Sequence, residues 1–134
     1  MYTEKVMDHF NNPRNVGIIK EPTVLVQVGD PQCGDSLLLS LTIEDDRIAD
    51  IKYKIYGCGA AVATSSVATE MALGKSLDEA LKIDEQCITE ALDGLPAEKL
   101  HCSNLAAGAI RGAITEYRKT FPPSTADNSA AERA

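Results

Sequence analysis

The spacing of apolar residues changes from that of a strand to that of a helix at the segment Tyr56-Gly57-Cys58-Gly59. Before it, residues 37–43 and 51–55 carry apolar side chains at alternate positions, which is the period of a β-strand with one buried face. The polar turn at residues 44–47 is too short for a crossover helix, so the two strands should form an antiparallel hairpin. After the change, residues 60–73 have helical spacing. We therefore expect a sheet that is covered by the helices that follow it.

The segments before the hairpin add a helix and a strand. Residues 2–10 predict a short helix that ends at Asn11-Asn12-Pro13, because the residue before a proline is disfavoured in the helical conformation. Residues 23–28 are rich in β-branched side chains and predict a further strand. The expected fold class is α+β, with a small antiparallel sheet of about three strands and helices packed on one of its faces.

Capping residues predict where the later helices begin. Ser76 and Glu79 form a capping box at the start of a short helix. Asp84 is expected to cap a second helix. Ser103 is expected to cap the last helix, which runs to about Lys119.

Length and charge limit the classes of protein that fit. The 134 residues suit one domain, expected over residues 1–120, and residues 121–134 are predicted to be a disordered tail because few large apolar side chains remain there. The net charge of −7 argues against nucleic acids and anionic membranes as partners, since both require a basic surface. The sequence has no membrane-spanning run and no signal-peptide pattern, so we expect a cytoplasmic protein. In that reducing compartment, spaced cysteines favour metal binding or catalysis over disulfides.

Three of the four cysteines stand in short segments suited to metal binding: Cys33-Gly34-Asp35, Gly57-Cys58-Gly59 and His101-Cys102-Ser103. Glycine lets the backbone and a bulky ligand approach closely, and Asp and His can bind a metal beside a thiolate. Cys33 precedes one strand of the hairpin and Cys58 follows the other, so both should lie at the same end of the sheet. Cys102 should lie at the N-terminal end of the last helix, whose dipole favours a thiolate. If that end faces the same edge, the three sulfurs meet.

Each of these residues also has a simpler interpretation. A cysteine alone is commonly a small buried hydrophobe, and Cys87, inside a helical segment, is expected to be structural or a bystander. Asp35 could be a strand-start residue, but it should point to the same side of an extended chain as Cys33, which favours a ligand role. His101 could cap a helix or serve as an alternate ligand. His9 has no neighbouring cysteine and is expected on the surface.

The donor set leaves the kind of site open. Zinc is the simplest guess from Cys and His, although the spacing lacks the C-x2-C pairs of structural zinc sites. An iron–sulfur cluster also binds thiolates, and three cysteines with Asp or His fall one thiolate short of the usual set. Such a cluster should be held less tightly, which suits assembly and release. A thiol hydrolase using Cys102 is disfavoured, because the adjacent His101 should not point at Cys102 from the start of a helix.

Short segments spread over residues 1–120 match a known family in order and with few gaps: residues 2–10, 12–17, 33–35, 56–60, 74–80 and 101–106. In these segments the sequence resembles the U-type iron–sulfur cluster scaffold family, which includes IscU and the N-terminal domain of NifU. The His before Cys102 and the compact interval from Cys58 to Cys102 resemble the IscU branch.

The resemblance implies a scaffold without turnover of its own. It implies that Cys33, Asp35, Cys58, His101 and Cys102 bind the cluster or a metal. A 2Fe–2S cluster would be assembled from Fe2+, electrons of a ferredoxin-type donor, and persulfide sulfur from a pyridoxal-phosphate cysteine desulfurase, and then passed to acceptor apoproteins. Cys102 would accept the persulfide, and Asp35 would keep the cluster labile. Zn2+ could replace iron, and a homodimer could carry one cluster between its subunits.

The sequence departs from the family pattern in one segment. Leu95-Pro96-Ala97-Glu98-Lys99 stands where many members have Leu-Pro-Pro-Val-Lys, the segment that a DnaK-like chaperone binds. Because Ala97 and Glu98 replace its centre, the chaperone is not carried over as a partner. The alternative function from the donor set is a zinc-dependent sulfur acceptor or a zinc-binding regulator.

Overall fold

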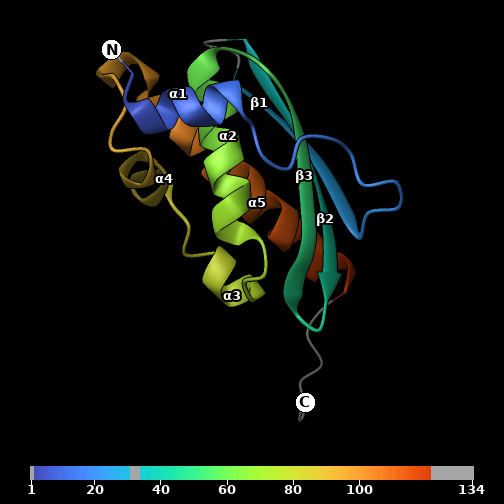
Figure 1. Cartoon of the computed structure of the whole chain (residues 1–134). Coiled ribbons are helices and arrows are strands. Elements are labelled where there is room, and N and C mark those ends of the chain that lie inside the picture. Colours follow the sequence, from blue (N-terminus) through green and yellow to red (C-terminus); the bar gives the residue numbers. More distant parts are fainter. Residues whose placement is uncertain (1, 31–33, 122–134) are drawn as a thin grey trace.

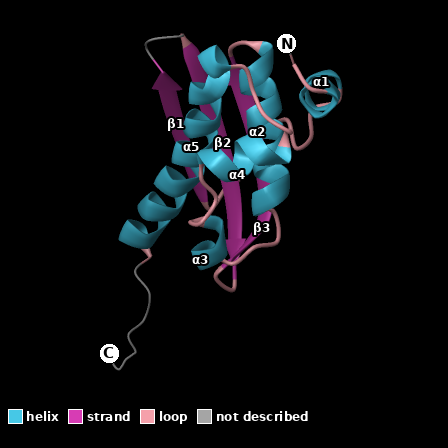
Figure 2. Cartoon of the chain, turned by 90° about the vertical axis from the view of Figure 1, so that its left-hand side faces the viewer, coloured by secondary structure: helices cyan, strands magenta, loops and turns pink. Residues whose placement is uncertain are grey.

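Two layers make up the protein, a three-stranded antiparallel sheet and a set of helices on one of its faces (Figures 1 and 2). The computed structural model describes residues 2–30 and 34–121. Cys33 and the residues after Phe121 therefore lie outside the described part, and the domain limits and disordered tail remain predictions. The strands run in the order β1-β2-β3, with β1 at Val24–Asp30, β2 at Asp35–Glu44 and β3 at Arg47–Tyr56. The predicted fold class is confirmed.

A tight turn fixes the pairing of β2 with β3. Glu44 pairs with Arg47, and the two residues between them, Asp45 and Asp46, have positive φ angles of 53° and 61°. Two residues of that conformation twist in the same sense as the strands they join, and Asp tolerates it. At the other end of the hairpin Ser36 pairs with Tyr56, so the start of β2 lies beside the end of β3.

The helices follow the predicted order, and their bounds are α1 Glu4–Asn11, α2 Gly59–Ala72, α3 Leu77–Ala80, α4 Glu85–Ala91, the 3-10 helix η1 Ala97–Lys99 and α5 Leu100–Thr120. Helices α2 and α5 pack against the sheet and against each other, and α1 packs against α2. Most residues of α2 are buried, and they are mainly Ala, Ser and Thr. Their small side chains let neighbouring elements approach this helix from several sides. No helix in the described part of the chain is long and apolar enough to cross a membrane.

The caps of the short helices match the predictions, but that of the last helix does not. Ser76 and Glu79 form the capping box of α3, and Asp84 caps α4 by accepting from the Cys87 N–H. Ser103, in contrast, is not a cap, because α5 begins at Leu100. Ser103 is fully buried, and its Oγ lies 2.8 Å from Oγ1 of Thr89 in α4. The Ser103 hydroxyl, which the sequence pattern assigned to the helix terminus, thus forms a hydrogen bond between two helices.

His9 is also not where it was expected. It is only 8% exposed, and its Nδ1 lies 2.7 Å from the Ser66 Oγ in α2. Its Nε2 lies 3.5 Å from the Glu70 carboxylate. The surface prediction was wrong because α1 packs against a helix whose small side chains leave room for the imidazole.

Candidate metal centre

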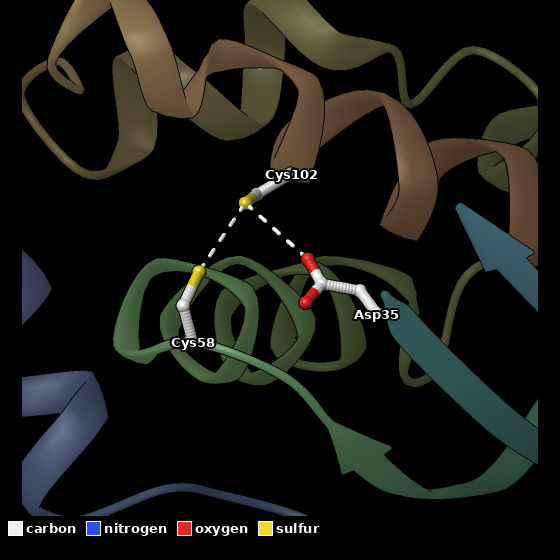
Figure 3. Close-up of side chains that lie close together, drawn as sticks. All are labelled: Asp35, Cys58 and Cys102. Atoms are coloured by element: carbon white, nitrogen blue, oxygen red, sulfur yellow. Dashed lines mark hydrogen bonds between the residues drawn. The ribbon is translucent and has the colours of Figure 1, made fainter. Parts of the chain in front are cut away.

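Three segments that are far apart in the sequence meet at one end of the sheet (Figure 3). Asp35 is the first residue of β2. Cys58 lies two residues after the end of β3 and is the N-cap residue of α2. Cys102 is in the first turn of α5. The hairpin register brings the first two together, and the packing of α5 against α2 and the sheet adds the third.

The three side chains are close enough to bind one ion. The Cys58 and Cys102 sulfurs lie 3.8 Å apart, and the Cys102 sulfur lies 3.9 Å from the Asp35 Oδ2. The ligand atoms of all three residues lie within 4.8 Å of one another. Two sulfurs bound at about 2.3 Å to a tetrahedral ion are separated by about 3.8 Å. The spacing in this structure therefore suits a shared metal. Within the described part of the chain, no other group of three or more Cys, His and acidic residues has such spacing.

The three side chains of the site differ in how far they are exposed to solvent. Asp35 is 4% exposed and Cys102 is fully buried, whereas Cys58 is partly exposed. Cys58 and Asp35 line an open pocket of about 500 Å³, together with Gly34, Ile55, Tyr56, Gly57 and Lys99. A ligand larger than a single ion can thus approach through the pocket and reach the Cys58 thiol and the Asp35 carboxylate.

His101 lies beside Cys102, contrary to the expectation that neighbours at a helix start point apart. Its Nε2 is 3.6 Å from the Cys102 sulfur. The imidazole is close enough to donate to the sulfur, but His101 is not among the residues whose ligand atoms all lie within 4.8 Å of one another. Its role as a ligand remains a prediction, and Cys33 lies outside the described residues.

Sequence reasoning did not single out Lys99 as a residue of the site. The negative charge of the Cys58 thiolate, followed by that of Tyr2, raises the pKa of the Lys99 ammonium above its usual value. A cation next to the pocket stabilises negative charge on a thiolate or an anionic ligand there. The feature of the sequence that could have indicated Lys99 is its position three residues before Cys102. Cys87, by contrast, is partly buried in α4 near the Lys82 carbonyl and does not join the group.

Comparisons with known proteins identify the relatives of this chain. A sequence model described as the NifU-like N terminal domain matches residues 1–122. The iron-sulfur cluster assembly scaffold protein IscU 1 of Archaeoglobus fulgidus is 56% identical over 117 residues, which cover 87% of this chain and 76% of the relative. The IscU scaffold protein of Escherichia coli is 48% identical over 121 residues, which cover 87% of this chain and 94% of that protein.

A solved structure supports the fold. The crystal structure of a putative iron-sulfur cluster assembly scaffold protein for the SUF system from Fervidobacterium islandicum superposes with a TM-score of 0.74 at 24% identity, covering 84% of this chain and 96% of that one. With the match of the family model over nearly the whole described chain, these similarities establish that the protein belongs to the family of NifU-like N-terminal domains.

Proposed function

We propose that this chain is a scaffold on which a 2Fe–2S cluster is assembled and from which it passes to acceptor apoproteins. The observation that carries the proposal is the convergence of Asp35, Cys58 and Cys102, of which Asp35 and Cys58 line an open pocket. The names of the relatives, which are iron–sulfur cluster assembly scaffold proteins, support it. They favour a cluster scaffold over a zinc-dependent sulfur acceptor or zinc-binding regulator.

The proposed ligand set is Cys33, Asp35, Cys58, His101 and Cys102. Thiolates with one imidazole or carboxylate suit Fe2+ and a 2Fe–2S cluster, and they also accept Zn2+. A set with three thiolates should bind a cluster less tightly than four cysteines do. Incomplete thiolate ligation therefore suits a cluster that has to leave, either from one chain or from a homodimer that shares it.

Sulfur is proposed to arrive at Cys102 as persulfide from a pyridoxal-phosphate cysteine desulfurase. The Cys102 thiolate attacks the outer sulfur of the desulfurase persulfide, so that a new S–S bond forms and the desulfurase cysteine leaves as a thiolate. Two electrons from a ferredoxin-type donor then cleave the Cys102 persulfide to sulfide and restore the thiolate. The chain itself carries out no catalytic turnover in this scheme, and a cytoplasmic location keeps its thiols reduced.

Anaerobic reconstitution tests the function. The chain is incubated with Fe2+, cysteine and a cysteine desulfurase, and the visible absorption of a 2Fe–2S species is recorded together with a metal analysis. We expect the Cys33→Ala, Cys58→Ala and Cys102→Ala variants each to lose most of this absorption, whereas Cys87→Ala, the matched control, keeps it. Stoichiometric zinc without any cluster in the wild-type chain would support the zinc function instead. Normal absorption in all three variants would reject the site.

A further inference from the structure

We infer that Gly57 is a positioning residue, whose missing side chain leaves the space that the Asp35 carboxylate occupies at the metal-binding pocket. A Cβ atom built on Gly57 would lie 2.3 Å from the Asp35 Oδ1 and 2.7 Å from its Cγ. Non-bonded heavy atoms in contact normally lie about 3.5–4.0 Å apart. Any side chain at residue 57 would therefore have to displace the carboxylate.

The backbone does not explain this glycine. Glycine is commonly required where φ is positive, as it is at Gly17, Gly34, Gly74 and Gly94. Gly57 is not among the described residues with positive φ, so its backbone conformation is open to alanine. The constraint at this position is thus the space taken by a neighbouring side chain.

Asp35 has little freedom to move aside. It is 4% exposed, its backbone pairs with Asp30 of β1, and its Oδ2 faces the Cys102 sulfur at 3.9 Å. The short side chain has only two torsions, so a displaced carboxylate changes its position relative to both thiols. An alanine at residue 57 should therefore remove the carboxylate from its place in the site.

The second glycine beside Cys58 faces another neighbour. A Cβ atom on Gly59 would lie 3.3 Å from carbon atoms of the Phe10 ring in α1, away from the carboxylate. The two glycines that flank Cys58 thus leave space for different groups, one for Asp35 and the other for α1. Gly59→Ala is consequently a matched control for crowding next to Cys58.

A cycle of variants in the absence of metal tests the contact directly. We expect Gly57→Ala to lower the melting temperature of the wild-type chain but to have much less effect in an Asp35→Ala chain. There the nearest atom left is the Ala61 Cβ at 3.3 Å. The effect of Gly59→Ala should be the same in both backgrounds. If the Gly57→Ala variant does not fold, the inference requires that the double variant with Gly57→Ala and Asp35→Ala still folds. Equal losses in both backgrounds, or no loss in either, overturn the inference.

Titration with Co2+ alone tests the consequence for the site, and this part rests on the proposed ligand role of Asp35. We expect Gly57→Ala to weaken Co2+ binding by roughly tenfold to a hundredfold, as is usual when a ligand loses its orientation, and to alter the cobalt absorption as Asp35→Ala does. In the Asp35→Ala chain it should cause no further change. Unchanged Co2+ binding by Asp35→Ala would reject the ligand role, and the unfolding cycle would still decide the placement of the carboxylate by Gly57.

Discussion

The sulfur atoms of Cys58 and Cys102 lie 3.8 Å apart, although 44 positions separate the two residues along the chain. Cys58 occupies the N-cap position of α2 and Cys102 is in the first turn of α5, so both helices direct their N-terminal ends to one place. The positive ends of the two helix dipoles therefore act on the same pair of sulfurs. This arrangement favours anionic ligands in the pocket.

The distance between these sulfurs predicts a disulfide on mild oxidation. The S–S bond length is about 2.05 Å, so a small approach of the two side chains is sufficient. In a Cys33→Ser chain treated with diamide, we expect mass spectrometry to find the cross-linked peptides of Cys58 and Cys102. Prior addition of Zn2+ should suppress the cross-link. Cross-links that involve mainly Cys87 would contradict the geometry.

Two adjacent serines of α2 should differ in their effect on stability. Ser66 is fully buried; its Oγ accepts from the Arg14 backbone N–H at 2.9 Å and lies 2.7 Å from the His9 Nδ1. Ser66→Ala leaves these groups without their partner, and we expect a loss of about 1–3 kcal/mol in the free energy of unfolding.

Ser65 supplies the matched control. It is 2% exposed, and its Oγ has no hydrogen-bond partner within the described residues. Ser65→Ala should therefore change the free energy of unfolding by no more than about 0.5 kcal/mol, or increase it slightly. Urea unfolding of both variants measures the difference. Equal losses for the two serines would be evidence against the network around His9.

Stability should fall on mild acidification because of His9. Burial, followed by the charge of Arg14, lowers the pKa of His9 from its usual value of 6.5, and this outweighs the opposite effects of Glu70 and Asp8. The unfolded chain then binds a proton more readily than the folded chain. The contribution of neutral His9 is complete above pH 6.5 and is lost as the pH falls towards the lower pKa of the folded state.

Unfolding experiments over a pH series check this expectation. Between about pH 7.5 and pH 5.5, the free energy of unfolding of the wild-type chain should decrease more steeply than that of His9→Gln. The variant should be less stable at the higher pH, because it loses the contact with Ser66. Parallel curves for the two proteins would show that His9 does not cause the dependence.

The capping box of α3 should affect stability without affecting the metal site. The Ser76 Oγ accepts from the Glu79 N–H at 3.1 Å, and the Glu79 carboxylate accepts from the Ser76 N–H at 3.1 Å. Ser76→Ala should cost about 1 kcal/mol. Helix α3 lies far from the N-terminal ends of α2 and α5 (Figure 1), so Co2+ binding by the folded variant should equal that of the wild type. A change in Co2+ affinity would indicate coupling between the two ends of the domain.

The features that the sequence predicted well have their signals within a few residues. The capping box at Ser76, the cap at Asp84 and the hairpin joined at Asp45-Asp46 each depend on short-range chemistry. The hairpin alone also placed Cys58 beside the start of the preceding strand. Short-range signals were therefore sufficient for the hairpin and for the proximity of two of the three grouped residues, Asp35 and Cys58.

Features that depend on packing between distant helices were not predictable in this way. Ser103 has the residue type of a helix cap, but its hydroxyl bonds to Thr89 of another helix. His9 has the polarity of a surface residue, but it is buried and lies within hydrogen-bond distance of Ser66 in another helix. The contact between Gly57 and the Asp35 carboxylate depends on side-chain positions that no residue pattern encodes. In each case the deciding partner lies on another element.

The site joins three segments that the backbone brings together only when the domain is folded: the start of β2, the cap of α2 and the first turn of α5. A group bound across them is therefore bound by the folded state alone. At a concentration a hundred times its dissociation constant, such a ligand adds about 2.7 kcal/mol to the free energy of unfolding. Loading and unloading thus change the resistance of the whole domain to proteolysis and hydrogen exchange. A partner protein that binds only the more rigid form of the domain can therefore distinguish the loaded scaffold from the empty one without contacting the bound group.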